Sequence, residues 1–132
     1  MFIDTSAVVA ILARERDAGE YATKLARATR RLCAGHVVLE ASMRLSSLLG
    51  VDPREAEDAI TRMFADAEVE VVSIDAVVAR EAVAAFAKFG KGRGHRARLN
   101  FGDCLSYACA RVHAAPLLFK GSDFATTDID RA

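Results

Sequence analysis

The sequence predicts an α/β fold with a parallel sheet and helices on both of its faces. Short apolar segments of strand character alternate with helical patterns through most of the chain, and this order is typical of parallel sheets. A length of 132 residues suits one compact domain with one hydrophobic core. No repeat, low-complexity segment or linker divides the chain. We therefore expect residues 1–132 to form a single domain.

The first half of the chain is expected to hold two strands and three helices. The first strand ends at Asp4, and Thr5 and Ser6 suit the beginning of the helix that follows. Gly50 suits the end of the third helix, because glycine accepts the backbone conformation found there. In order, we expect a strand at 1–4, helices at 5–15 and 17–29, a strand and turn at 30–36, and a helix at 37–50.

The second half contains the clearest helix start, at Asp52. Asp52 can cap a helix, Pro53 fits its first position, and Glu55 is placed for a capping box. The expected segments are a helix at 51–67, a buried strand at 69–74, a helix at 75–90 capped by Asp75, a loop at 91–99, a helix from Asn100, and a strand at 117–119.

The composition sets limits on binding and location. Lys and Arg total 18, as do Asp and Glu, so any surface for nucleic acid must be local. No apolar run could span a bilayer, and the first residues lack the basic leader of a secretory signal. We expect a cytoplasmic protein without membrane contact. The three cysteines have no metal-ligand spacing, and we expect them to be small buried hydrophobic residues.

Four carboxylates stand out because of where the expected elements place them. In an open parallel sheet, functional groups gather at the carboxyl ends of the strands. Asp4 ends the first strand, Asp123 follows the last one, and Asp103 opens a helix that can point at the same edge. Glu40 lies in an otherwise apolar stretch, where a buried carboxylate needs a partner. Arg44, one helical turn later, is the only basic residue nearby.

Each acid alone also has a structural explanation. Asp4 could cap the following helix, and Asp123 could be a turn residue. Asp103 could complete a capping box with Asn100. Together in one crevice, however, the carboxylates would repel one another and need a cation. Ligation by oxygen alone favours Mg²⁺ or Mn²⁺ over zinc, and one or two such ions would suit phosphodiester hydrolysis.

A basic loop precedes Asp103 and could bind a nucleic-acid backbone. Phosphate contacts hold such a substrate in place without reading its sequence. The alternative is a solvated charged loop, which is the commoner situation for a loop taken alone. Aromatic residues that could stack on unpaired bases are few, although Phe89 and Phe101 flank the loop. The basic residues are Lys88, Lys91, Arg93, His95, Arg96 and Arg98.

Four motifs, in this order, resemble those of the PIN-domain nucleases, and more narrowly those of the VapC-type toxins of bacterial toxin–antitoxin pairs. They are "MFIDTSAVVAIL" at 1–12, the acid of "VVLEAS" at 37–42, "NFGDCLSYACA" at 100–110 and "LLFKGSDFATTDI" at 117–129. The set runs nearly end to end, and it is specific although no single motif is. The resemblance implies a PIN-like three-layer α/β/α fold, with a central parallel sheet of short strands flanked by helices.

The resemblance also implies a function, a site and partners. The chain would be a metal-dependent endoribonuclease, with Mg²⁺ or Mn²⁺ held by carboxylates and activating water. It would act as a toxin, form a homodimer, and be neutralised by a cognate antitoxin that covers the acidic crevice. Asp4 and Asp103 would be the principal metal ligands, and Glu40 and Asp123 would complete a catalytic set of four. Supporting residues would be Ser6, orienting Asp4 or a metal-bound water, and Asp128, an acid of more structural character; RNA contacts would come from Lys91, Arg93, Arg96 and Arg98.

Other interpretations remain open at this point. A PIN-like module could bind RNA or protein without cleaving, although a pure binder has no need of four repelling carboxylates. A phosphatase of the haloacid type would use Asp4 as nucleophile and a second acid at position 6, where Ser6 stands. His36 lies at a turn before Glu40, and we assign it no chemistry. The apolar segments 5–13 and 59–65 could form a dimer face or part of the core.

Overall fold

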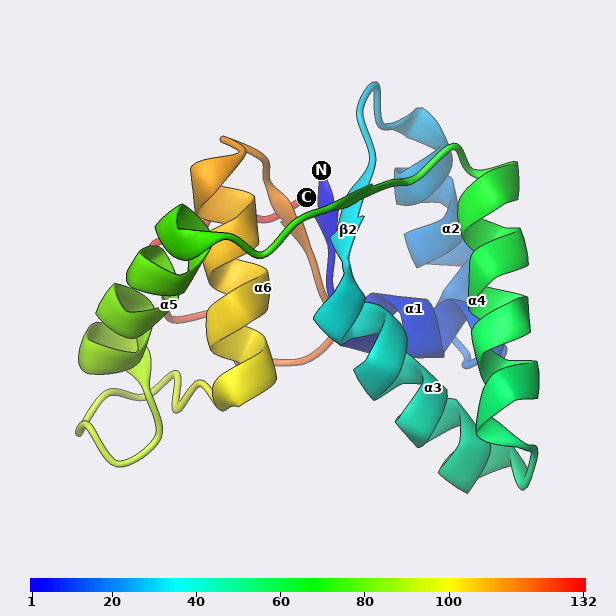
Figure 1. The fold of residues 1–132 in the computed structure, drawn as a ribbon, viewed down its shortest axis with the longest axis horizontal. Coiled ribbons are helices and arrows are strands. Elements are labelled where there is room, and N and C mark those ends of the chain that lie inside the picture. Colours follow the sequence, from blue (N-terminus) through cyan, green and yellow to red (C-terminus); the bar gives the residue numbers. More distant parts are fainter.

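A four-stranded parallel sheet in the order β3-β2-β1-β4 forms the centre of the fold (Figure 1). The computed structural model describes residues 1–132. Phe2 of β1 pairs with Leu32 of β2 on one side and with Leu117 of β4 on the other, so the first strand is central. The strands are β1 Phe2–Ile3, β2 Leu32–Ala34, β3 Glu70–Val72 and β4 Leu117–Leu118.

Helices cover both faces of this sheet. In Figure 1, α5 and α6 stand on one side of the strands and α1, α2, α3 and α4 on the other. The fold is therefore the expected three-layer α/β/α arrangement around a parallel sheet of short strands. The helices are α1 Thr5–Leu12, α2 Ala18–Arg27, α3 Gly35–Leu49, α4 Pro53–Asp66, α5 Ala76–Phe89 and α6 Phe101–Val112. None of them combines the length and the apolar character that crossing a membrane requires.

The helix ends follow the capping residues closely. Asp52 caps α4 by accepting a hydrogen bond from the backbone N–H of Arg54 at 2.8 Å, and Asp75 caps α5. The expected capping box with Glu55 is wrong, because the cap bond goes to Arg54 and the Glu55 carboxylate makes no bond in return. Gly50 follows α3 with a φ of 67°, the left-handed conformation that favours glycine.

The expectation that the strand at 69–74 would be buried is wrong as well. Glu70 and Val71 of β3 are exposed and only Val72 is buried. The reason is position: β3 pairs only with β2 and forms an edge of the sheet, where an apolar run is not required on both faces.

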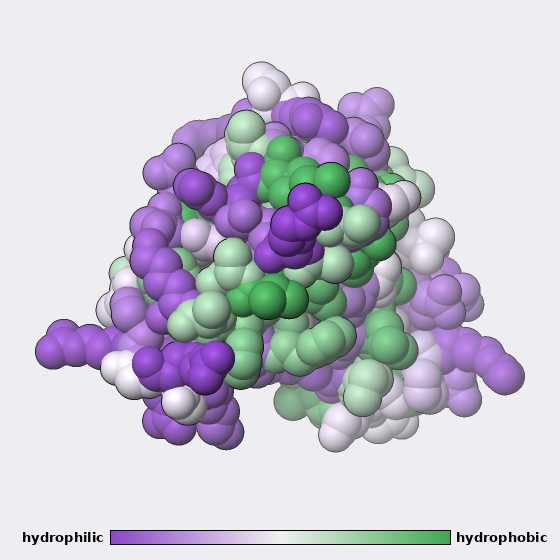
Figure 2. Space-filling model, turned by 60° about the vertical axis from the view of Figure 1, so that its left-hand side comes forward, coloured by the Kyte–Doolittle hydropathy of each residue, from purple (hydrophilic) through white to green (hydrophobic).

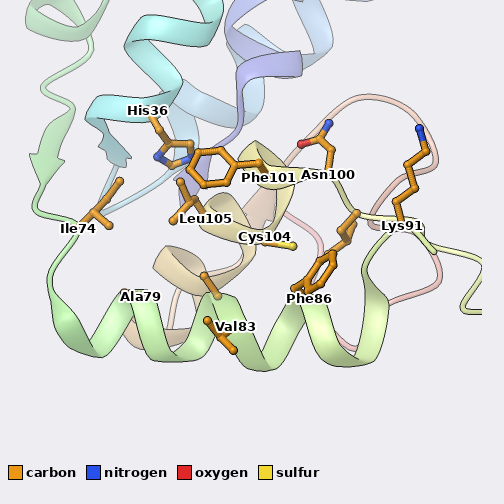
Figure 3. A pocket seen from close by; sticks show the side chains of 12 residues that line it. His36, Ile74, Ala79, Val83, Phe86, Lys91, Asn100, Phe101, Cys104 and Leu105 are labelled. Carbon is orange, nitrogen blue, oxygen red and sulfur yellow. The ribbon is translucent and has the colours of Figure 1, made fainter. Parts of the chain in front are cut away.

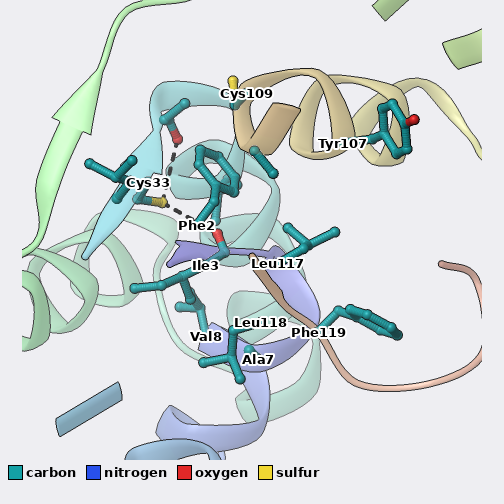
Figure 4. Packing of buried hydrophobic residues seen from close by; sticks show 14 of the residues in the cluster. Phe2, Ile3, Ala7, Val8, Cys33, Tyr107, Cys109, Leu117, Leu118 and Phe119 are labelled. Carbon is teal, nitrogen blue, oxygen red and sulfur yellow. Dashed lines mark hydrogen bonds between the residues drawn. The ribbon is translucent and has the colours of Figure 1, made fainter. Parts of the chain in front are cut away.

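The core lies between the sheet and both helix layers (Figure 4). Residues 7–10 of α1 are buried in it, as are Ile60 and Phe64 of α4. The apolar faces of α1 and α4 therefore belong to the core and are not free to form a dimer surface. The three cysteines are free and buried, as expected. Hydrophobic side chains also reach the surface, and Figure 2 shows them among hydrophilic ones on the face that comes forward with the α5 side of the molecule.

Candidate active site

The four candidate carboxylates lie at the carboxyl edge of the sheet. Asp4 directly follows β1, α3 with Glu40 directly follows β2, and Asp123 lies in the loop after β4. Asp103, in the first turn of α6, is close enough to the other three for their charges to raise its pKa. Because the carboxyl ends of parallel strands lie at the same edge of the sheet, acids that are far apart in the sequence come together here.

Asp4 is buried and held by a short chain of hydrogen bonds. It is 5% exposed, and its Oδ2 accepts from the backbone N–H of Ser6 at 2.9 Å and from the Ser6 hydroxyl at 2.5 Å. The Ser6 Oγ in turn accepts from the backbone N–H of Lys120 at 3.0 Å. The expected contact of Ser6 with Asp4 is present, and the link from Ser6 to Lys120 was not predicted.

Lys120 joins this chain of bonds to the loop between α1 and α2. Its ammonium group pairs with Glu15 and with Asp17, the latter at 2.7 Å. These hydrogen bonds raise the pKa of Lys120, so the side chain stays charged. Lys120 thereby anchors the segment between β4 and Asp123. Its backbone N–H donates to Ser6, and its side chain pairs with Glu15 and Asp17.

Glu40 has a partner that sequence reasoning missed. Its Oε2 accepts a hydrogen bond from the Thr5 hydroxyl at 2.9 Å, and it makes no ion pair with Arg44. Gly102 stands against the same oxygen, because a Cβ at that position would lie 2.6 Å from Oε2. Thr5 and Ser6 follow Asp4 in the motif "DTS". The Thr5 hydroxyl donates to Glu40, and the Ser6 hydroxyl donates to Asp4.

Asp103 forms the capping box that its structural explanation predicted. Its backbone N–H donates to Asn100 Oδ1, and its Oδ2 accepts from the backbone N–H of Asn100, each at 2.9 Å. Only one of the two carboxylate oxygens is used, so Oδ1 can still bind a ligand. Burial raises the pKa of Asp103 to about 6, helped by the charges of Asp4, Asp123 and Glu40 and opposed by the bond from Asn100.

Asp123 is exposed and shares a cavity of about 400 Å³ with Asp103 and part of the basic loop. Lys91, Arg96 and Arg98 line this cavity. Arg93 does not, since its guanidinium lies 5.2 Å from the centroid of the Phe86 ring. The structure thus brings three of the four candidate RNA-binding cations to the acidic site.

Two further candidates have structural partners. Asp128 does not line the cavity. Its carboxylate accepts hydrogen bonds from Lys88 Nζ at 2.7 Å and from the Tyr107 hydroxyl. The bond from Lys88 lowers the pKa of Asp128. The Nε2 of His36 lies 3.1 Å from Ser106 Oγ. Burial lowers the pKa of His36 to about 4, so the ring is neutral at pH 7. Asp128 thus links Lys88 of α5 with Tyr107 of α6, and His36 of α3 contacts Ser106 of α6.

The donor set fits a hydrated divalent ion better than a closed metal cage. No three His, Cys, Asp or Glu side chains stand together as ready ligands. Burial is the main cause of the raised pKa of Asp103, and the charges of Asp4, Asp123 and Glu40 add to it. Mg²⁺ commonly binds one or two carboxylates and keeps several waters, and such an ion would relieve this repulsion.

Comparison with known proteins gives matches over the whole length of the chain. The PIN domain family matches residues 1–130. Ribonuclease VapC28 of Mycobacterium tuberculosis is 46% identical over 132 residues, which are 100% of this chain and 97% of that protein. Ribonuclease VapC30 of the same species is 42% identical over 129 residues, covering 98% of this chain and 95% of the relative.

A solved structure has the same fold. The crystal structure of VapC20 from M. tuberculosis, described as a toxin that cleaves the sarcin–ricin loop, superposes with a TM-score of 0.76. The comparison covers 99% of this chain and 97% of that one, at 20% sequence identity. At this identity the likeness supports the fold alone.

Proposed function

Because this chain belongs to the PIN-domain family, and within it to the VapC ribonucleases, we propose that it is an endoribonuclease and the toxin of a toxin–antitoxin pair. The observation that carries the proposal is the joint placement of the acids and cations. Asp103 interacts with the charges of Asp4, Glu40 and Asp123, and it shares a cavity with three loop cations. Such a site can hold a phosphodiester and a divalent ion together.

Each acid has a role in this proposal. Asp4 and Asp103 are the principal ligands of Mg²⁺ or Mn²⁺, and Glu40 and Asp123 complete the site. When bound, the ion supplies an activated water and neutralises charge on the phosphate. Ser6 fixes the orientation of Asp4. Thr5 does the same for Glu40 through its hydroxyl.

The test is cleavage of total RNA by the purified protein, free of any antitoxin, with Mg²⁺, with Mn²⁺ or with EDTA. We expect discrete fragments with either ion and none with EDTA, and cleavage should return when Mn²⁺ is added in excess of the chelator. Equal cleavage with and without EDTA would contradict the metal-dependent mechanism. Binding of RNA without cleavage under every condition would favour a binding module instead.

The loop cations give a second prediction, on the salt dependence of RNA binding. Replacing Lys91, Arg96 and Arg98 with Gln should weaken binding and reduce the slope of log K against log salt by about 2, since each phosphate contact to single-stranded RNA contributes roughly 0.7. Fluorescence anisotropy with a labelled RNA measures both. The control replaces Arg54, Arg62 and Arg80, which are exposed and unpaired, and should leave the slope unchanged.

The proposal includes two protein partners. A cognate antitoxin would neutralise the toxin by placing a basic or otherwise complementary segment over the acidic crevice, where Asp123 is exposed. A homodimer is the assembly that the family suggests. Since the apolar faces of α1 and α4 lie in the core, a dimer surface would use exposed apolar residues of other helices, such as Leu48 of α3 and Val77 of α5.

A further inference from the structure

Phe101 is the most exposed large hydrophobic side chain of the protein, at 82%. It is the first residue of α6, between Asn100 and the turn that carries Asp103. The capping box of Asn100 and Asp103 begins this helix without help from an aromatic ring. Phe89, at the other end of the basic loop, is 2% exposed and belongs to the core. Of the two aromatic residues that flank the loop, only Phe101 can meet a ligand.

The Phe101 ring lines a cavity of about 330 Å³ beside Glu40. Figure 3 shows the ring projecting from the beginning of α6 toward His36. Because Gly102 has no side chain, the Glu40 carboxylate is not displaced from this place. An apolar cavity thus opens directly next to a candidate metal ligand. Its other lining residues are His36, Leu39, Met43, Asn100 and Gly102.

The acidic site therefore has cavities of opposite character on its two sides. One is charged and contains Lys91, Arg96 and Arg98 with Asp103 and Asp123. The other is largely apolar and lies beside Glu40, and Asn100 lines both. An RNA strand alternates charged phosphates with flat bases that stack on aromatic rings. The two cavities match these two parts of a single strand.

We propose that the cavity beside Glu40 is a base-binding subsite, in which an unpaired nucleobase next to the scissile phosphate stacks on the ring of Phe101. The Oδ1 of Asn100 is taken by the backbone N–H of Asp103, but its amide nitrogen makes no bond within the protein and can donate to the base edge. A base inside a duplex is stacked between its neighbours, so this subsite selects an unpaired nucleotide. This inference rests on the proposed ribonuclease function.

A second protein chain would also cover apolar surface, and a wider apolar cavity of about 930 Å³ adjoins the subsite. Phe101 lines both cavities, whereas Val83 and Phe86 of α5 line only the wider one. The smaller cavity alone reaches Glu40, whereas the wider one shares Asn100 and Lys91 with the charged cavity but is lined by no acid of the site. This continuity with the acidic site favours a base over a protein segment, and Val83 supplies the control that separates them.

The experiment measures kcat/KM on an RNA oligonucleotide that spans the main cleavage site found in total RNA. A matched series replaces one nucleotide at a time, near the cleaved bond, by an abasic residue that keeps the phosphate. For the wild type, one abasic position should lower kcat/KM about tenfold or more. Phe101→Ala should show a similar loss on the intact RNA and no further loss at that abasic position. Phe101→Trp should restore the wild-type pattern, and Val83→Ala should match the wild type throughout.

Other outcomes overturn the inference. One is a Phe101→Ala protein that cleaves like the wild type; another is one whose loss simply adds to that of every abasic substitution. A changed mass by light scattering, with the same activity loss in Val83→Ala, would assign Phe101 to a contact between protein chains. If the wild type cleaves no RNA, the ribonuclease proposal fails by itself. The abasic comparisons are then made by anisotropy on the binding of an unpaired RNA oligonucleotide, where an absent abasic effect overturns the subsite.

Discussion

The Asp4→Asn protein is expected to fold normally and to lose cleavage by a factor of about 10³. Asn keeps a side-chain oxygen that can accept from the Ser6 N–H, and it caps helices as well as Asp does. What it lacks is the negative charge that would hold a divalent ion at the end of β1. We expect unchanged circular dichroism, a melting temperature equal to or above that of the metal-free wild type, and loss of the Mn²⁺-induced rise in melting temperature.

The control for this variant is Asp52→Asn, the same change at the cap of α4. Asp52 accepts from Arg54 as Asp4 accepts from Ser6, but it is exposed and lies outside the acidic set. Its cleavage rate should equal that of the wild type within a factor of about two, because a cap exchange of this kind costs only a few tenths of a kcal/mol. Full activity of Asp4→Asn, or equal losses in both variants, would mean that Asp4 serves only as a cap.

The sequence predicted the architecture well because the relevant signals are local. Each strand and each helix can be recognised from a short segment of the sequence. Caps such as Asp52 and Asp75 lie next to the helices that they begin. The edge position of β3 was not accessible, since the order of strands in a sheet depends on pairing between distant segments. The same apolar run therefore reads as buried although Glu70 and Val71 are exposed.

In the site, too, local features could be predicted and contacts between distant segments could not. Asp4, Asp103 and Asp123 became candidates because each follows a strand or begins a helix, and Glu40 because it is an acid in an apolar stretch; their order also carries the resemblance to PIN domains. Their supports were missed where the contact spans a long stretch of sequence. Thr5 bonds to Glu40 across 35 residues, and Lys120 reaches Ser6 across 114. Composition could show that Phe89 and Phe101 flank a basic loop, but only packing decides which of them is exposed.

The Asp103→Asn protein is expected to be more stable than the metal-free wild type and to lose cleavage by a factor of about 10² to 10³. Asn keeps the oxygen that accepts from the Asn100 N–H, so the capping box remains. Burial raises the pKa of Asp103 to about 6, which means that the folded state disfavours its charged form. Removing that charge should raise the free energy of unfolding at pH 7 by about 1–3 kcal/mol.

The sign of this effect fixes its pH dependence. Between pH 4 and pH 6 the folded wild type binds more protons at Asp103 than the unfolded chain does, so its stability falls as the pH rises through this range. The gain from Asp103→Asn should be small at pH 4 and complete above pH 7. Contributions of His36, which titrates in the same range, are common to both proteins and cancel in the difference. Urea unfolding in EDTA at several pH values measures this difference in the free energy of unfolding between the two proteins.

A matched control and a metal titration decide what the stability difference means. Asp58→Asn changes an exposed acid of α4 outside the acidic set and should shift the free energy of unfolding by less than about 0.5 kcal/mol at every pH. Mn²⁺ should stabilise the wild type, because it binds only the folded site, and stabilise Asp103→Asn much less. A variant that is less stable than the wild type at pH 7 would show that the main role of the Asp103 carboxylate is to cap α6. A stabilised but inactive variant would show that the protein keeps a destabilising charge because its chemistry requires one.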